Sequence, residues 1–367
     1  MRILNLLLPK KLSIIFFFIE KKTHAFKLLL FISSFLTARS PYRCYRNTPS
    51  ITTCWRNDVE SFTLRSSHLE QYPFFKLFNK DYFNQCNLPD DQIPYRNNEH
   101  ISVTGKKLKE LIEHVLEEIR AKKTTYTHFI LLQKKDFNLK KAYGLLVLKF
   151  KNYPFVLKLF IESPEGLARP FDKGIEPIFF FFMGGGINRH LTGFTRIPNR
   201  QEVLKKLSKS TYWSQLVDIP RKWFWTPYSS RWISVTGHNI GKQDQLQTVI
   251  PGIYCIIADE IIYERKFSIA SAYDRNMALK LCNYLENSID PHINNFMIEK
   301  GTNKLIIIDT EHFASLVGLR EKKEFRSYLQ WYFYLGTKCA KDMFLRTRNQ
   351  CKKVQCTESP LCLKFHK

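Results

Sequence analysis

Three apolar segments follow one another closely in the middle of the chain, and they constrain the fold more than any other feature of the sequence. They span residues 126–132, 143–150 and 153–161. Only a Lys/Asn/Asp-rich loop and the pair Lys151-Asn152 separate them. Connections this short join antiparallel strands, because parallel neighbours need a crossover of a dozen or more residues. The sequence therefore predicts an antiparallel meander.

Further helices and strands are predicted on both sides of the meander. Apolar residues at helical spacing predict a helix over 106–122. A helix over 199–210 is predicted with Asn199 as N-cap and Glu202 at its third position, an arrangement like a capping box. The remaining predicted elements are strands at 179–183, 231–236 and 252–258 and helices at 270–287 and 325–345.

The charge of the chain favours anionic partners. Lysine and arginine number 57 against 33 acidic residues, which gives a formal charge of +24. The excess is spread along the whole chain, so no specific nucleic-acid partner is predicted. An anionic surface remains a candidate partner, and background composition is the alternative explanation.

Residues 1–40 are both apolar and basic. The last apolar run, 27–36, has the length of a signal-peptide core and small residues follow it, while every run is too short for an ordinary membrane span. We interpret the segment as a signal peptide or a membrane-associating segment, which favours an exported or membrane-associated protein over a cytoplasmic one. A misassigned start is the alternative.

Nine cysteines give no disulfide framework, because the count is odd and the chain is long. Cys255 and Cys282 lie in apolar runs and are predicted to be buried thiols. The basic tail, residues 346–367, holds three cysteines and His366, but their spacing matches no common zinc motif.

The sequence Asp290-Pro-His292-Ile-Asn-Asn295 carries the clearest chemistry of the chain. Two short apolar segments follow it, 296–299 and 304–308, and the second ends at Asp309-Thr-Glu311. A hairpin of these segments returns Asp309 to the side of Asn295, where their oxygens suit a hard cation such as magnesium. The alternative is a polar turn without further chemistry, which leaves the downstream acid unexplained.

The order of elements and these motifs resemble the kinase-like fold over roughly residues 126–345. The Asp-x-His-x-x-Asn sequence is similar to that of the lipid-kinase and aminoglycoside-phosphotransferase branch. The resemblance implies a two-lobed α+β fold, with an antiparallel-sheet N-lobe over 101–258 that carries an insertion at 162–198, and a small, mainly helical C-lobe over 259–345. Residues 41–100 are then an irregular N-terminal extension.

The resemblance also assigns roles to the polar turn. It implies that Asp290 is the base that accepts or orients the substrate hydroxyl, and that Asn295 and Asp309 hold Mg²⁺ on the phosphates of ATP. His292 is expected to brace the loop by hydrogen bonding instead of titrating.

Lys158 is the expected phosphate-binding lysine. It lies inside the apolar strand Phe155-Val-Leu-Lys-Leu-Phe, where a charge needs a partner. The resemblance implies a glutamate from the next helix, and Glu202 is the predicted residue. The alternatives are a glutamate nearer in sequence, or a Lys158 that faces solvent from an edge strand.

Three features depart from the family pattern. The loop over 134–142 lacks a glycine-rich signature, Asp309-Thr-Glu311 replaces Asp-Phe-Gly, and no Ala-Pro-Glu sequence follows. We therefore expect a divergent phosphotransferase that moves a phosphoryl group from a magnesium nucleoside triphosphate to a protein, lipid or small-molecule hydroxyl. The alternatives are a catalytically inactive kinase-like binding module, and a basic nucleic-acid or membrane-surface protein.

Two other segments leave alternatives open. Gly184-Gly-Gly186, with Arg189 and His190, forms either an anion-binding nest or a flexible turn. The tryptophans between Trp213 and Trp232 either stack on nucleobases or pack in the core.

Overall fold

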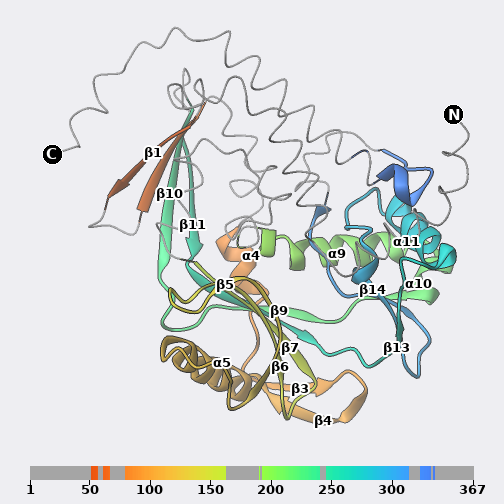
Figure 1. Cartoon of the computed structure of the whole chain (residues 1–367), viewed down its shortest axis with the longest axis horizontal. Coiled ribbons are helices and arrows are strands. Elements are labelled where there is room, and N and C mark those ends of the chain that lie inside the picture. Colours follow the sequence, from red (N-terminus) through yellow and green to blue (C-terminus); the bar gives the residue numbers. More distant parts are fainter. Residues whose placement is uncertain are drawn as a thin grey trace, which may run out of the picture. The chain divides into compact units, whose positions relative to one another are not determined.

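The predicted meander forms the centre of the fold. The computed structural model describes residues 51–56, 61–66, 79–162, 190, 192–239, 245–313, 323–331 and 334. Its largest sheet has the order β5-β6-β7-β12-β9, and all neighbours are antiparallel (Figure 1). These strands are Phe129–Asn138, Tyr143–Phe150, Phe155–Ile161, Ile253–Asp259 and Lys222–Trp225, in the same order. The meander is confirmed, although β5 extends into the segment predicted as a loop.

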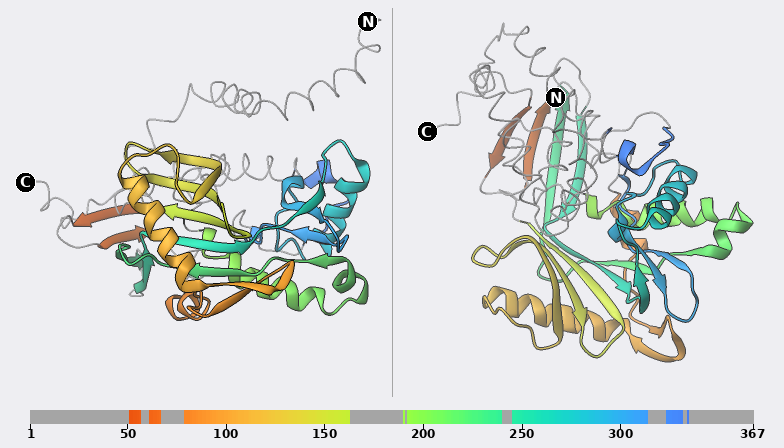
Figure 2. Two further views of the ribbon diagram at one scale, coloured as in Figure 1. Left: turned by 90° about the horizontal axis from the view of Figure 1, so that it is seen from below. Right: turned by 45° about the vertical axis from the view of Figure 1, so that its right-hand side comes forward.

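Helix α5, Gly105–Arg120, covers one face of this sheet and confirms the predicted helix over 106–122 (Figure 2). Its N-cap is Thr104, whose hydroxyl accepts a hydrogen bond from the backbone N–H of Lys107 at 3.2 Å. Leu108 and Ile112 are fully buried in one cluster with Leu146 and Leu157. Burial of such a side chain stabilises the fold by about 1.5–3 kcal/mol.

The opposite face of the sheet carries the polar chemistry. Lys158 pairs with Val147 on β6 and with Ile256 on β12, and Ile256 pairs in turn with Phe224 on β9. Directly paired residues point to the same side of a sheet. The side chains of these four paired residues therefore form a row across the sheet, on the face that α5 does not cover.

A second core lies around a four-stranded sheet of order β13-β14-β15-β8. Its strands are Tyr263–Lys266, Phe296–Glu299, Leu305–Ile307 and Val217–Asp218. The hairpin of β14 and β15 confirms the one predicted after the polar turn. The helices that contribute to this core are α9 (Arg196–Leu207), α10 (Thr211–Leu216) and α11 (Ala272–Tyr284), and η3 (Ile293–Asn295) leads into β14.

The segment 41–100 differs from the predicted irregular extension, because long-range pairing gives its described part regular structure. Strands β1 and β2 join a sheet of order β1-β2-β10-β11, and β3 pairs with β4. The elements concerned are Ile51–Arg56, Ser61–Ser66, α4 (Lys80–Gln85), Gln92–Tyr95, Asn98–Thr104, Trp232–Asn239 (β10) and Gln245–Pro251 (β11).

Helix α9 begins three residues earlier than predicted. Its N-cap is Thr195, so Asn199 is buried inside the helix and the predicted capping box is wrong. Pro198 lies in the first turn of the helix. Backbone N–H groups there have no acceptor within the helix, so the N–H that proline lacks costs no helical hydrogen bond.

The described residues form a mixed α+β structure of antiparallel and mixed sheets with helices. None of its helices combines the length and the apolar character that a membrane crossing requires. Several predictions lie outside the described residues: the apolar segment 1–40, the strand 179–183, the glycines at 184–186, most of the helix at 325–345, and the tail.

Candidate functional site

Lys158 and Asp309 form an ion pair across 151 residues of sequence, with Nζ 2.8 Å from Oδ2. Strands β6 and β12 flank β7, so Lys158 is not on a sheet edge. The predicted pair with Glu202 is wrong, because Glu202 is exposed on α9 and the partner is an aspartate. The expectation that this half-buried lysine has an acidic partner is confirmed.

Arg196, the first residue of α9, is a second cation on Asp309, and it was not predicted from the sequence. Its Nε donates to Asp309 Oδ1 at 2.8 Å, and its Nη2 lies 3.1 Å from Glu311 Oε2. The guanidinium also packs over the ring of Phe160, with a distance of 5.6 Å to the ring centre. The side chain is only 5% exposed, and its Nη1 is buried without a hydrogen-bond partner among the described residues.

Lys222 is the third cation of the site. It lies on β9 opposite Ala258, two strands away from Lys158 and on the same face. Its Nζ donates to the hydroxyl of Thr310 at 2.9 Å and to the carbonyl of Ile308 at 3.1 Å. A lysine within the apolar, aromatic strand Lys-Trp-Phe-Trp is the sequence signal that could have indicated it, since Lys158 lies in the same kind of context.

Hydrogen bonds fix the segment that follows β15. The Thr310 hydroxyl donates to the carbonyl of Arg196 at 2.5 Å. The amide of Asn199 donates to the carbonyls of Thr310 and Ser288, at 3.0 and 2.8 Å. These bonds from α9 therefore fix Thr310, next to Asp309, and Ser288, two residues before the polar turn. The Asn199 side chain that makes two of them was expected to cap the helix.

The pKa values of the site reflect burial and close opposite charges. Burial would raise the pKa of Asp309, but the neighbouring Arg196 and Lys158 hold it well below its usual value. Burial lowers the pKa of Lys158, and the Asp309 carboxylate offsets part of that effect. Burial also lowers the pKa of Lys222 well below its usual value, since its direct partners are neutral.

Asp290 lies close to this cluster, and its pKa is shifted in the opposite direction from that of Asp309. Burial raises its pKa to about 7, with further contributions from the charges of Glu311 and Asp309. Hydrogen bonds from the His292 N–H, at 2.9 Å to Oδ1, and from the Asn295 side chain oppose that shift. A carboxyl group with a pKa near neutrality is suited to proton transfer.

The polar turn and the end of β15 come together as predicted. Asn295 Nδ2 donates to the carbonyl of Asp290 at 3.1 Å, and the carbonyl of Asn295 accepts a bond from the Ile308 N–H at 3.0 Å. His292 Nδ1 accepts from the N–H of Asn294 at 3.3 Å, which matches a bracing role.

The oxygens of Asn295, Asp309 and Glu311 are of the kind that magnesium prefers. The donor set therefore fits the metal chemically, but both carboxylate oxygens of Asp309 accept hydrogen bonds from Lys158 and Arg196. Among the described residues, no group of three or more His, Cys, Asp and Glu is placed to bind a metal ion.

Other candidate residues are structural in the described part of the chain. Trp213 and Trp225 are buried in the two cores, as are the thiols of Cys255 and Cys282. His190 is buried, with its Nε2 2.8 Å from the carbonyl of Pro251.

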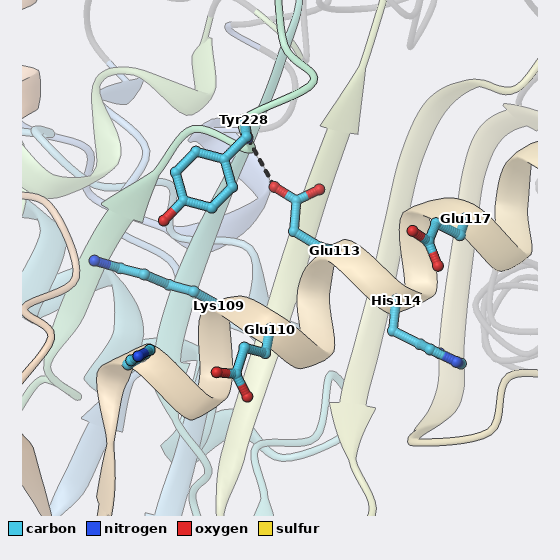
Figure 3. Close-up of a pocket in the computed structure, with 7 residues that line it drawn as sticks. Lys109, Glu110, Glu113, His114, Glu117 and Tyr228 are labelled. Carbon is cyan, nitrogen blue, oxygen red and sulfur yellow. Dashed lines mark hydrogen bonds between the residues drawn. The ribbon is translucent and has the colours of Figure 1, made fainter.

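A shallow hollow of about 430 Å³ lies along the outer side of α5, away from this cluster (Figure 3). Glu113 accepts a hydrogen bond from the N–H of Tyr228 there, at 2.7 Å. Its wall mixes lysines, glutamates and His114, so it does not present charge of a single sign to a ligand.

No protein-family model matches the chain, and no curated protein matches it.

Proposed function

We propose that the chain is a divergent kinase-like phosphotransferase that moves a phosphoryl group from a magnesium nucleoside triphosphate, such as ATP, to a hydroxyl acceptor. The observation that carries the proposal is the pair of Lys158 and Asp309. In protein kinases the phosphate-binding lysine lies on the third strand and a metal-binding aspartate follows later in the chain. Lys158 lies on the third strand of the meander, and Asp309 follows the hairpin after the polar turn.

The proposal assigns the sheet of β5, β6, β7, β12 and β9 to an N-lobe. The elements of the second core belong to a smaller C-lobe, which therefore also takes in α9 and α10 from before Asp259. In this arrangement the half-buried side chains of Val147, Val156 and Ala258 lie on the same sheet face as Lys158, by strand register. An apolar floor next to a cation suits the flat base and the phosphates of a nucleotide.

The residues divide the work of phosphoryl transfer as follows. Lys158 orients the phosphates, and Asp290, with its pKa of about 7, accepts the proton of the attacking hydroxyl. Asn295 and Asp309 would hold magnesium, which spreads the charge of the transferring group when it is bound. The acceptor is a protein, a lipid or a small molecule.

A second candidate is a catalytically inactive kinase-like module. It is favoured by the two cations that already occupy both oxygens of Asp309. Turnover separates the two candidates, since both bind nucleotide.

Thermal-shift titration with ATP, with and without Mg²⁺, tests the proposal. Wild-type protein should show a magnesium-dependent shift that Asp309→Asn loses, because the variant lacks a charged oxygen ligand. Glu264→Gln is the matched control, since Glu264 is an exposed carboxylate on β13. If the wild-type protein shows no magnesium-dependent shift and no ATP turnover, both candidates are contradicted. A shift without turnover would favour the inactive module.

A further inference from the structure

We propose that Arg196 is a built-in cation that competes with the divalent metal for Asp309 and Glu311, and so determines how tightly the site binds metal. The inference rests on the proposed function and names a residue that regulates the same site. It departs from the resemblance, which implies a glutamate on this helix.

The first step is the geometry of the guanidinium group. Its Nε and Nη2 both reach Asp309, at 2.8 and 3.4 Å, and Nη2 also contacts Glu311 at 3.1 Å. A metal ion held by Asp309 and Glu311 would use these same carboxylate oxygens. Arginine does not lose its proton in proteins, so only movement of the side chain frees them.

The second step is the balance of charge. Lys158 and Arg196 contact the carboxylates of Asp309 and Glu311, while Asp290 lies close by, as does Lys222, whose pKa burial lowers. A divalent cation that enters beside Lys158 and Arg196 would be repelled by both. Departure of Arg196 lowers that repulsion and exposes two oxygen ligands, whereas Lys158 contacts only one oxygen of Asp309.

The third step is that the guanidinium group of Arg196 does not make all of its possible hydrogen bonds in its present position. Its Nη1 is buried and has no hydrogen-bond partner in the part of the chain that the structure describes, although the rest of the group is well bonded. An unmade hydrogen bond in a buried site disfavours the arrangement that contains it. An arginine fork matches phosphate oxygens as well as carboxylates, so a bound nucleotide gives the displaced side chain new partners.

Titration of the full chain with Mn²⁺ tests the inference. Electron paramagnetic resonance measures the free Mn²⁺ and so gives the affinity of the site. Arg196→Gln should bind Mn²⁺ at least about tenfold more tightly than wild type, a change equivalent to about 1.4 kcal/mol. Lys205→Gln is the matched control, because Lys205 is an exposed cation on the same helix and should leave the affinity unchanged. The double variant Arg196→Gln/Asp309→Asn should lose the gain.

Equal or weaker Mn²⁺ binding by folded Arg196→Gln would overturn the inference. If circular dichroism shows that this variant is unfolded, Arg196→Lys is measured in its place. A single ammonium group bonds fewer oxygens than a guanidinium group, so this variant should bind Mn²⁺ at least about threefold more tightly than wild type. Equal or weaker Mn²⁺ binding by Arg196→Lys overturns the inference. ATP binding is measured separately. A manganese gain without any ATP binding contradicts only the phosphotransferase, whereas ATP binding with an unchanged manganese affinity contradicts only the role of Arg196.

Discussion

The guanidinium group of Arg96, in the turn between β3 and β4, donates at 2.8 Å to the carboxylate of Glu299, 203 residues later at the end of β14. It also reaches Asp218 on β8 at 2.6 Å. The side chain of Glu299 is only 1% exposed, so its carboxylate is buried against the guanidinium group of Arg96. One arginine thus fastens the β3–β4 hairpin to the sheet of the second core.

Arg96→Met should therefore lower the free energy of unfolding by about 3 kcal/mol, because it leaves the buried carboxylate of Glu299 without its charged partner. Urea denaturation provides the measurement. Lys107→Met is the control: its pair with Glu110 is half exposed, and its loss should cost about 0.5 kcal/mol or less. Equal losses in the two variants would contradict the structural role of Arg96.

Asp290→Asn should reduce phosphoryl transfer at least about a hundredfold, since the amide cannot accept the proton of the attacking hydroxyl. Nucleotide and metal binding should persist, because Lys158 and Asp309 remain. ATP turnover and autophosphorylation report the first effect, and the magnesium-dependent thermal shift reports the second. Full activity of the variant would remove Asp290 from the mechanism.

Acid should destabilise the protein partly through His190. Burial lowers its pKa to about 4, against 6.5 for an ordinary histidine, with a small opposing effect from the Pro251 carbonyl. The unfolded chain therefore binds the proton more readily, and the stabilising contribution is complete above pH 6.5 and is lost as the pH falls towards 4. The lost contribution amounts to about 3 kcal/mol.

His190→Gln removes this titration. Denaturant unfolding at a series of pH values between 7 and 4 should give a shallower loss of stability for the variant than for wild type. Parallel curves would show that His190 does not contribute to the acid sensitivity.

Gly193 lies against the hydroxyl group of Tyr254. A Cβ atom at this position would lie 1.9 Å from that oxygen, and Tyr254 is fully buried and donates to the carbonyl of His190. Gly193→Ala should therefore cost about 1–3 kcal/mol of stability.

A double-mutant cycle identifies the cause of this cost. Tyr254→Phe removes the oxygen, so Gly193→Ala should be less destabilising in that background than in wild type. Ring atoms at 3.0 Å keep the rescue partial. Additive effects of the two substitutions would contradict a direct clash.

The sequence predicted those parts of the fold that depend on neighbouring residues. Successive apolar runs with short connections predicted the meander, and Gly301 and Asn303, both at positive φ, mark the turn between β14 and β15. The parallel pairing of β2 with β10 joins strands far apart in the chain. No local pattern encodes such a pairing, so the segment 41–100 was expected to be irregular.

The partner of Lys158 was mispredicted for a related reason. Asn199 and Glu202 have the spacing of a helix start, but the chain uses Thr195 and begins the helix at Arg196. That shift leaves Glu202 exposed and places Arg196 on Asp309. The identity of a tertiary partner depends on where a helix begins, and the competing cap sequences do not settle that position.

The position of Lys158 in the middle of the large sheet also affects the stage at which the chain is only partly synthesised. Strand β7 ends at Ile161, and its neighbour β12 begins only at Ile253, so β7 leaves the ribosome long before the strand that covers it. During that interval β7 is an apolar edge, the kind of segment that associates between nascent chains. A lysine within such a segment opposes that association. We therefore expect the charge that later pairs with Asp309 to oppose aggregation of the unfinished sheet.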